Sequence, residues 1–280
     1  MPVSPACRVR SAAAVLALAL AACSGPALRA PAPAPAPAPA KAVGYLPAAA
    51  VPDSLQLLPA PPAADSPGEA LDLAINREAL ALRGSARWQQ AARDADLSFP
   101  NGAGQFACAL DVAIDAQQTP HLYTLLERSR IDASAATKAA KRRYQRARPF
   151  LSNAQAVCTS GDLDDLRQSG SYPSGHSAIG WAWALILSEI APERATALIA
   201  RGRNYGESRL VCNVHWQSDV LAGRFMGAAT VARLHDDPTF SADLAAARGE
   251  IAAARAAGRM PAGDCTAENA VLQVRPASAL

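Results

Sequence analysis

After its first residues the chain has no apolar run long enough to cross a bilayer. The longest such run, residues 178–187, is soon followed by Glu189. The chain also has little excess of charge of either sign, since its 27 Lys and Arg are nearly balanced by 24 Asp and Glu. The formal net charge of +3 falls to +1 when residues 1–22, with two arginines and no acids, are removed. This balance gives no argument for a nucleic-acid partner or an anionic membrane surface.

Runs of β-branched residues are few, and no Cys and His stand close together at zinc-site spacing, so we expect no metal. Alanine and leucine are abundant instead, and apolar residues recur at intervals of three and four. We therefore predict an all-α, single-domain helical bundle with its functional site at one pole. The predicted helices are residues 79–95, 119–146, 177–190, 193–206, 215–234 and 238–257.

The first residues predict an exported lipoprotein. Two arginines precede an unbroken run of small and apolar residues, 11–22, which suits a signal peptide and is too short to span a bilayer. The run ends in Leu-Ala-Ala-Cys, the pattern of a bacterial lipobox in which Cys23 is lipidated. Ser24 follows without an Asp that would favour the inner membrane, so we expect a periplasmic protein tethered to the outer membrane. An ordinary cleaved signal is the alternative.

A spacer and a globular domain follow. Residues 30–39 are five Ala-Pro repeats, which favour a stiff polyproline II segment of roughly 3 Å per residue. From about residue 51 the composition is globular, and roughly 200 residues are enough for one well-buried core. The predicted organisation is a lipoprotein signal peptide at 1–22, a lipidated Cys and spacer at 23–50, a helical domain at 51–258 and a C-terminal tail at 259–280.

Four cysteines lie beyond the signal peptide and the lipobox: Cys108, Cys158, Cys212 and Cys265. An even number in an oxidising compartment predicts two disulfides, for which three pairings exist. We favour Cys158–Cys212, because each lies beside one of the polar clusters described next, and those clusters must converge. Cys108–Cys265 then follows by elimination.

The first polar cluster is Lys141…Arg148-Pro149. Seven residues are about two helical turns, so a continuous helix would present Lys141 and Arg148 on one face. Pro149 disfavours helical geometry at Arg148, and we expect the helix to end there and free the guanidinium. A guanidinium offers phosphate a planar fork of donors, and an ammonium offers a point charge. The alternative is a solvated basic face that also includes Arg142, Arg143 and Arg146.

The second cluster, residues 170–177, reads Gly-Ser-Tyr-Pro-Ser-Gly-His-Ser and precedes an apolar helical run. Small residues let backbone N–H groups approach an anion, and a helix N-terminus adds positive potential. Ser174 can donate its hydroxyl, and His176 is placed to act as a general acid near neutral pH. The alternative is a Ser-capped helix with a structural histidine.

The third cluster is Ser208-Arg209 followed by His215 and Asp219. If residues 215–219 are helical, His215 and Asp219 share a face. A carboxylate that accepts one imidazole N–H fixes the tautomer and leaves the other nitrogen free as a nucleophile. Arg209 would reach the same anion. The alternative is that His215 and Asp219 form an ordinary pair on the surface of a helix.

Together and in this order, the three clusters resemble the signature of the type 2 phosphatidic acid phosphatase superfamily. Residues 170–177 are similar to the octapeptide of bacterial class A non-specific acid phosphatases, with Ser177 where Thr is usual. Residues 57–62, 207–209 and 215–219 also resemble that class, and the resemblance covers about residues 45–257. The lipobox and the Ala-Pro spacer depart from it, because members usually have a plain cleavable signal.

The resemblance implies an acid phosphatase for a broad range of phosphate monoesters that needs no cofactor or metal and is often a homo-oligomer. His215 would attack phosphorus and form a phosphohistidine, Asp219 would orient His215, and His176 would protonate the leaving alkoxide and then activate water. The groups that would bind the phosphate oxygens are Lys141, Arg148, Arg209, Ser174 and the backbone N–H of Gly175. We expect an acidic pH optimum, because His176 must be protonated while His215 stays neutral.

Two other interpretations remain open. A vanadium-dependent haloperoxidase has a closely similar site in which the histidine ligates vanadium, but the class A octapeptide and the short chain argue against it. A non-catalytic lipoprotein would need only the cations, so the complete set of His176, His215 and Asp219 argues for an enzyme. The lack of membrane-length runs argues against an integral lipid phosphatase. Outside the clusters, His121 and His235 are expected at the surface, and Trp181, Trp183 and Trp216 in core packing.

Overall fold

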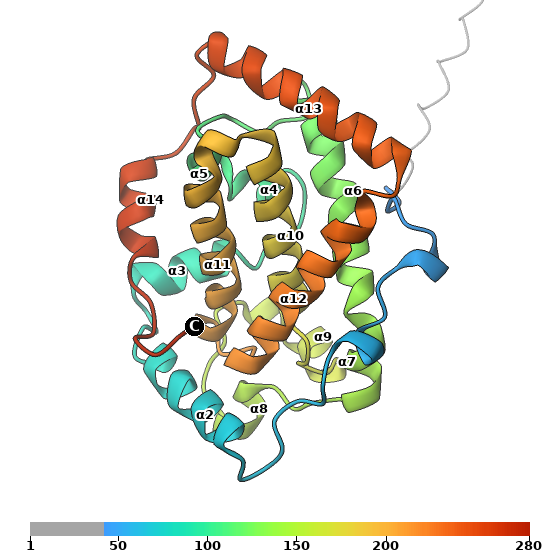
Figure 1. The fold of residues 1–280 in the computed structure, drawn as a ribbon. Coiled ribbons are helices and arrows are strands. Elements are labelled where there is room, and N and C mark those ends of the chain that lie inside the picture. Colours follow the sequence, from blue (N-terminus) through green and yellow to red (C-terminus); the bar gives the residue numbers. More distant parts are fainter. Residues whose placement is uncertain (1–41) are drawn as a thin grey trace, which may run out of the picture. The chain divides into compact units, whose positions relative to one another are not determined.

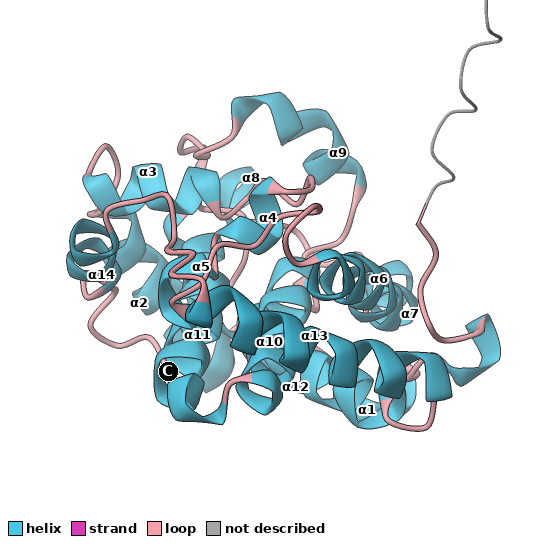
Figure 2. Cartoon of the chain, turned by 90° about the horizontal axis from the view of Figure 1, so that it is seen from above, coloured by secondary structure: helices cyan, strands magenta, loops and turns pink. Residues whose placement is uncertain are grey.

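The computed structural model describes residues 42–280, and throughout that range the only regular elements are helices, which confirms the predicted all-α fold (Figures 1 and 2). The expected signal peptide, the lipidation site at Cys23 and the Ala-Pro repeats lie outside the described residues.

Six helices have fourteen or more residues and form the body of the fold: α2 (Pro67–Leu80), α6 (Pro120–Ala136), α10 (Gly175–Ile190), α11 (Ala195–Val211), α12 (Gln217–Leu234) and α13 (Pro238–Ala256). The shorter α-helices are α1 (Ser54–Leu57), α3 (Ala86–Arg93), α4 (Asn101–Gly104), α5 (Ala107–Leu110), α7 (Lys138–Tyr144), α8 (Pro149–Asn153), α9 (Leu163–Gln168) and α14 (Cys265–Leu272). Three short 3-10 helices are η1 (Ala48–Ala50), η2 (Ser160–Asp162) and η3 (Pro192–Arg194).

Helix α10 is the centre of the bundle. It is apolar almost all round, with Trp183, Ile186 and Leu187 fully buried, and such a helix must be covered on every side. Helices α11, α12 and α6 pack against it, and α13 lies across α6 and α10 (Figure 1). Ser174 is the N-cap of this helix: its hydroxyl accepts the backbone N–H of Ser177 at 3.2 Å and so caps the first turn. The N-terminus of α10 is therefore fixed at the cluster that the sequence singled out.

Glycines allow α12 to lie close against α10. A Cβ atom at Gly227 would collide with the carbonyl oxygen of Ala178, and one at Gly223 with the carbonyl oxygen of Ser174. Because glycine has no side chain, the two backbones approach more closely there than alanine would permit. This approach brings the first turn of α12 to the first turn of α10.

Two predicted helices are wrong in their extent. The interval 79–95 is divided between α2 and α3, because Gly84 adopts a φ of 77° and Ser85 caps a new helix.

The interval 119–146 is divided into α6 and α7, and α7 ends at Tyr144, before Gln145 with a φ of 42°. Lys141 and Arg148 therefore do not share a helix face. Arg148 instead precedes α8 with an extended backbone, which agrees with the restriction expected before Pro149.

The remaining predictions locate their helices well. The interval 177–190 corresponds to α10 and 238–257 to α13, each within two residues. The interval 193–206 falls short of α11, which continues through Arg209 to Val211. The interval 215–234 starts two residues early, so His215 lies just before α12 and not on it.

Residues 259–280, expected as a tail, contain α14 and pack on the body of the fold. Helix α14 contacts α3, and Cys265 at its start forms a disulfide with Cys108. Farther along, Ala279 is buried in a small apolar cluster that also includes Ile75 of α2. The second disulfide joins Cys158 to Cys212, with Cα atoms 4.7 Å apart. Both pairings agree with the favoured assignment from the sequence.

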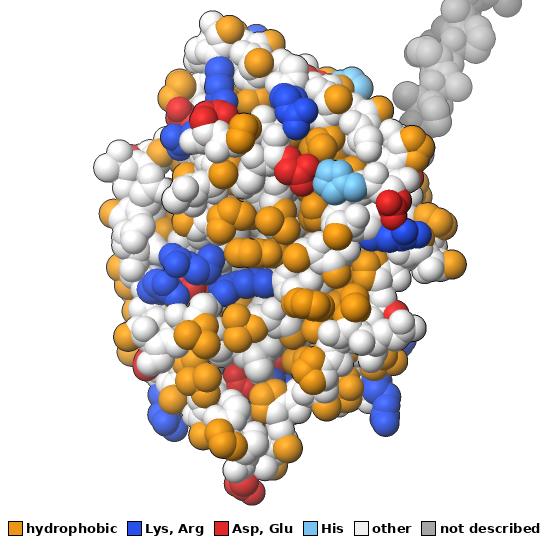
Figure 3. Space-filling view, viewed as in Figure 1, with side chains coloured by type: hydrophobic (Ala, Val, Ile, Leu, Met, Phe, Trp, Pro, Cys, Tyr) orange, Lys and Arg blue, Asp and Glu red, His pale blue; other side chains and the backbone are white. Residues whose placement is uncertain are grey.

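The surface seen in Figure 3 mixes apolar and charged side chains. An open groove of about 630 Å³ lies between the segment that follows α1 and the exposed side of α12, and its lining includes Leu57, Pro59, Leu221 and Phe225. Of the helices in residues 42–280, none combines the length and the apolar character needed to cross a bilayer.

Because α12 lies close to α10, we predict that replacing glycine by alanine has opposite effects on the free energy of unfolding at two helical positions. Gly227→Ala should lower the free energy of unfolding by about 1–3 kcal/mol, because the added methyl group meets backbone. Gly249→Ala, on α13 with open space around it, should raise it by about 0.5–1 kcal/mol through better helix propensity. Urea denaturation followed by circular dichroism measures both. Equal effects at the two positions would contradict the tight crossing.

Candidate active site

The three clusters predicted from the sequence meet at one end of the bundle, where α10 and α12 begin and α11 ends (Figure 1). Lys141 Nζ donates to the carbonyl of Gly170 at 2.9 Å, which joins the first cluster to the second. Arg148 Nη1 lies 3.1 Å from His215 Nε2, which joins the first to the third. The backbone N–H of Ser174 donates to the carbonyl of Asp219 at 2.9 Å, which joins the second to the third.

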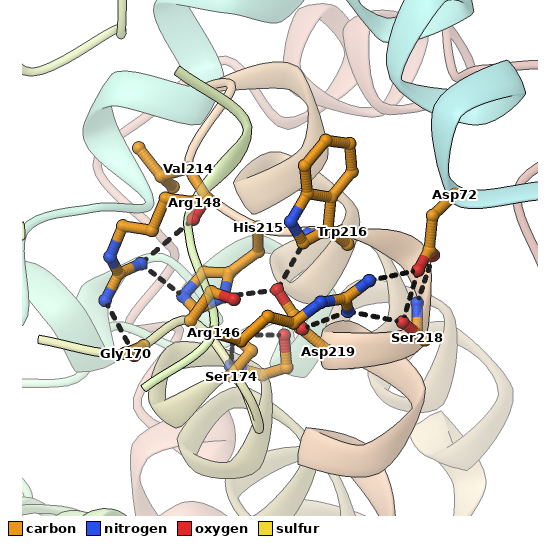
Figure 4. A network of polar contacts seen from close by, with 12 residues as sticks. Asp72, Arg146, Arg148, Gly170, Ser174, Val214, His215, Trp216, Ser218 and Asp219 are labelled. Atoms are coloured by element: carbon orange, nitrogen blue, oxygen red, sulfur yellow. Dashed lines mark hydrogen bonds and ion pairs between the residues drawn. The ribbon is translucent and has the colours of Figure 1, made fainter. Parts of the chain in front are cut away.

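His215 and Asp219 contact each other although His215 is outside the helix. Asp219 occupies the first turn of α12, where its Oδ2 accepts the backbone N–H of Trp216 at 2.8 Å. The same oxygen lies 3.3 Å from Nδ1 of His215. Because an ionised carboxylate only accepts, Nδ1 carries the proton and Nε2 keeps its lone pair. Nε2 is therefore unprotonated, and it accepts an N–H of the Arg148 guanidinium at 3.1 Å (Figure 4).

His176 lies in the first turn of α10 and is partly buried. Its Nε2 is 2.9 Å from the carbonyl oxygen of Ala95, so Nε2 carries a proton and donates it. Nδ1 is then the nitrogen free to exchange a proton with a bound molecule. The carbonyl of Ala95, just after α3, is a contact that sequence reasoning missed, because every residue has such a group.

The cations of the site have no carboxylate to neutralise them directly. Within residues 42–280, Lys141, Arg148 and Arg209 form no ion pair with an acidic side chain. Arg148 is held by carbonyl groups, among them Leu166 at 2.9 Å and Val214 at 2.9 Å. Arg209 is 1% exposed, and its Nε has no hydrogen-bond partner in the described part of the chain. The arrangement leaves positive charge available to an anion, although the N–H groups of Arg148 already donate to protein acceptors.

Burial and mutual repulsion change the titration of these groups. Burial, reinforced by Arg148, lowers the pKa of Lys141 to about 7. The pKa of Arg148 falls to about 10 because of burial and the nearby Arg209. Burial and the neighbouring arginines also lower the pKa of His176 and of His215 well below the usual value for histidine. Without a bound anion, both imidazoles are therefore neutral near pH 7.

Ser174 and Gly175 form the turn that faces the cations. Ser174 is fully buried, and its Oγ accepts the hydroxyl of Ser177 at 2.8 Å. Ser177, where the resemblance would place Thr, thus makes its contact through the hydroxyl that both residues share. A Cβ at Gly175 would lie 4.0 Å from Cε of Lys141, so this first turn of α10 is next to the ammonium-bearing side chain. Its backbone N–H groups add to the positive potential.

Arg146 is the main residue of the site whose contacts sequence reasoning missed. Of the group considered as a solvated basic face, Arg142 and Arg143 are exposed, but the side chain of Arg146 is only 13% exposed. Its Nη1 donates to Oδ1 of Asp219 at 2.7 Å, and its Nη2 donates to Oδ2 of Asp72 on α2 at 2.7 Å (Figure 4). The local sequence gave no signal for Asp72.

A second buried network supports Ser208 and the Ala95 region. Asp94, fully buried at the end of α3, pairs with Arg201 of α11 and accepts the hydroxyl of Ser208. Arg87 donates to the same hydroxyl at 2.9 Å. Ser208 therefore ties α3 to the helix that carries Arg209, which is a structural contact and not one with a ligand.

The other residues considered from the sequence lie as follows. Cys212 is one helical turn beyond Arg209, so the Cys158–Cys212 disulfide ties the segment before α9 to the site. His121 and His235 are exposed and lie away from the clusters, beside Asp243 and Glu189. Trp183 is fully buried in the core, and Trp181 is only partly buried. Trp216 is 7% exposed and donates its indole N–H to the carbonyl of Ala147 at 2.9 Å.

Comparison with known proteins confirms the resemblance seen in the sequence. The profile of the PAP2 superfamily matches residues 128–240, which contain all three clusters. An acid phosphatase of Zymomonas mobilis is 40% identical over 209 residues, which are 75% of this chain and 79% of that protein. A non-specific acid phosphatase of Providencia stuartii is 43% identical over 209 residues, 74% of this chain and 84% of that protein. A non-specific acid phosphatase of Salmonella typhimurium is 43% identical over 195 residues, 69% and 78% of the two chains.

The lowered pKa of Lys141 predicts that anion binding weakens as the pH rises. Lys141 is cationic below about pH 7 and neutral above it, so the site loses one of three positive charges between pH 6 and pH 8.5. Sulfate keeps its charge over this range, and its dissociation constant should rise at least about tenfold. Lys141→Arg keeps its charge and should remove this dependence. Isothermal titration calorimetry measures both, and an equal pH dependence in the two proteins would assign it to another group.

Proposed function

This chain belongs to the PAP2 superfamily, and we propose that it is a non-specific acid phosphatase that hydrolyses phosphate monoesters through a phosphohistidine intermediate. One observation carries the proposal. The contact of Asp219 with His215 Nδ1 leaves Nε2 unprotonated, beside cations that have no carboxylate partner among residues 42–280. A site that only binds phosphate has no use for an oriented, neutral imidazole.

The first chemical step joins the substrate to the protein. Nε2 of His215 attacks phosphorus and forms the N–P bond while the P–O bond to the alcohol breaks. His176 gives its proton to the departing oxygen, so the alcohol leaves neutral. The positive charge that the imidazole of His215 acquires is offset by Asp219 on its other side. Lys141, Arg148, Arg209, Ser174 and the backbone N–H of Gly175 hold the non-bridging oxygens as charge develops.

The second step releases phosphate. His176, now neutral, removes a proton from a water molecule whose oxygen attacks phosphorus from the side that the alcohol left. The N–P bond breaks, His215 recovers its lone pair, and His176 regains the proton that it gave away. An alcohol in place of water would give phosphate transfer by the same route.

An acidic optimum follows from the surroundings of the two histidines. His176 must start protonated, and burial with the nearby Arg209 lowers its pKa well below the usual value in the free site. A bound phosphate dianion offsets the neighbouring cations and so makes protonation easier. His215 stays neutral because burial and three cations lower its pKa as well. We therefore expect the rate to fall from acid toward alkaline pH.

The proposal needs no metal, because Lys141, Arg148 and Arg209 supply the positive charge that a metal ion supplies in other phosphatases. It leaves the alcohol unspecified, since the residues assigned to binding contact only the phosphate group. Broad specificity for monoesters is the expectation that follows.

Hydrolysis of a chromogenic phosphate monoester at pH 5–6 in excess EDTA tests the mechanism. The wild type should remain active, and His215→Ala should lower kcat by at least about a thousandfold, because it removes the nucleophile. His235→Ala, an exposed histidine outside the site, is the matched control and should keep full activity. Activity that EDTA abolishes, or that survives in His215→Ala, would contradict the proposal. Halide oxidation only with added vanadate and peroxide would favour a haloperoxidase instead.

We also propose that the protein acts in the periplasm, tethered to the outer membrane through lipid on Cys23. The support is the lipobox and the Ala-Pro spacer in the sequence. Cells fed a labelled fatty acid should incorporate label into the wild type but not into Cys23→Ser, which should move from the membrane to the soluble fraction. Label in neither protein would leave an ordinary cleaved signal as the explanation.

A further inference from the structure

A buried ion pair, Arg146 with Asp219, lies on the Nδ1 side of His215, opposite the Nε2 atom proposed as the nucleophile. We propose that Arg146, held in place by Asp72, is a positioning residue that keeps Asp219 ionised and directed at His215, and thereby sets the lowest pH at which the enzyme works. This inference rests on the proposed phosphohistidine mechanism.

The contacts form a continuous chain from α2 to the imidazole. Asp72 accepts from Arg146, Arg146 donates to Asp219, and Asp219 contacts His215, with distances of 2.7, 2.7 and 3.3 Å (Figure 4). Asp72 is 2% exposed and Asp219 is fully buried. In such surroundings a single missing partner leaves an uncompensated charge, so the state of one member affects the next.

Arg146 is fixed by more than its two carboxylates. Its Nη1 also donates to Oγ of Ser218 at 2.7 Å, and its guanidinium lies over the ring of Trp216, 5.6 Å from the centroid. The indole N–H of Trp216 holds the carbonyl of Ala147, between Arg146 and Arg148. The two arginines therefore diverge, Arg148 toward Nε2 of His215 and Arg146 toward the far side of Asp219.

Asp72 serves both Arg146 and the start of α12. Its carboxylate accepts the backbone N–H of Ser218 at 2.8 Å and the hydroxyl of Ser218 at 2.6 Å. A carboxylate at a helix N-terminus is favourable by itself, so Asp72 also anchors the turn that carries Asp219. A pocket of about 280 Å³ reaches the pair from outside, with Glu69 among its lining residues.

The charges around Asp219 make Arg146 its principal partner. Burial raises the pKa of Asp219, and Arg146 is the strongest influence that lowers it. The other charged or titratable groups that face it are His215, Lys141, Arg148 and Tyr172. Lys141 and Arg148 are assigned to the phosphate, whose negative charge offsets them during turnover. Arg146 lies on the opposite side of Asp219, so its charge remains available to this carboxylate.

An enzyme that works in acid has particular need of this arrangement. If Asp219 took up a proton, it would no longer offset the positive charge that His215 acquires when it attacks phosphorus. The rate would then fall on the acid side with the protonation of Asp219. Removing Arg146 should make that protonation easier and move the acid limit to higher pH.

The test is the dependence of kcat on pH in EDTA for the wild type, Arg146→Gln and Arg146→Lys with a chromogenic monoester. Arg146→Gln should move the acid limb upward by about one pH unit or more, so that kcat falls about two- to fivefold at pH 5, approaches a tenfold fall at lower pH and changes much less at pH 7. Arg146→Lys keeps the charge and should restore most of the wild-type limb. The substrate's own titration is common to all variants and cancels in the comparison.

Two further variants separate this role from a merely structural one. Arg224→Gln removes another largely buried arginine of α12, paired with Glu207, and should leave the acid limb unchanged. Asp72→Asn leaves Asp219 as the only carboxylate that Arg146 contacts, so its acid limb should not move upward even if kcat falls. If the shift came from a loosened fold, the acid limb would move in the same direction in Arg146→Gln, Arg224→Gln and Asp72→Asn.

An acid limb that is the same in Arg146→Gln and the wild type, or one that moves equally in Arg224→Gln, would overturn the inference. In the background of Asp219→Asn, the loss of Arg146 should produce no additional shift. An inactive wild type would contradict the proposed function instead. In that case ¹⁵N NMR of the histidine side chains still tests the inference. As the pH is lowered, protonation of Asp219 should weaken its hydrogen bond with His215 Nδ1–H. The Nδ1–H signal should therefore be lost at a higher pH in Arg146→Gln than in the wild type.

Discussion

The site depends on the meeting of two helix N-termini, α10 and α12, which the hydrogen bond from Ser174 N–H to the Asp219 carbonyl fixes. Gly223 allows this contact, because a Cβ at that position would collide with the carbonyl of Ser174. The two first turns contribute His176 and Asp219, and they direct their N–H groups and positive potential toward the same region. Every other part of the site is arranged around this junction.

The buried positive charge at this junction is expected to lower the stability of the fold. Within residues 42–280, Arg148 and Arg209 are buried without a carboxylate partner, and repulsion adds to burial in lowering the pKa of Lys141 and Arg148. Backbone carbonyls replace these counter-ions only in part, because Nε of Arg209 has no hydrogen-bond partner in that range. In the proposed function a phosphate dianion would relieve this repulsion, so part of the affinity for the anion would come from the electrostatic strain between these cations.

The residues that meet at the site could be predicted from the sequence better than the structure that supports them. The short motifs contain residue types that suit the proposed anion binding and proton transfer: Lys141, Arg148, His176, Arg209, His215 and Asp219. The helix break near Gly84 was missed because apolar periodicity continues across it, although Gly84-Ser85 is a common stop and start signal. The end of α7 had no such signal, since Gln145 adopts its positive φ without being glycine.

The partners that hold the motif residues are hidden from the sequence for a physical reason. Asp72 is 74 positions from Arg146, and the two meet because each contacts Ser218 at the start of α12, against which α2 packs. The carbonyl of Ala95 acts through its position, which the buried Asp94 network determines. Groups that touch a ligand must be particular residue types, so they leave a recognisable pattern. Groups that orient them need only the right position and charge, and the fold creates that position. The hydrogen bond from Arg146 to Asp219 is therefore seen in the structure and not in the sequence.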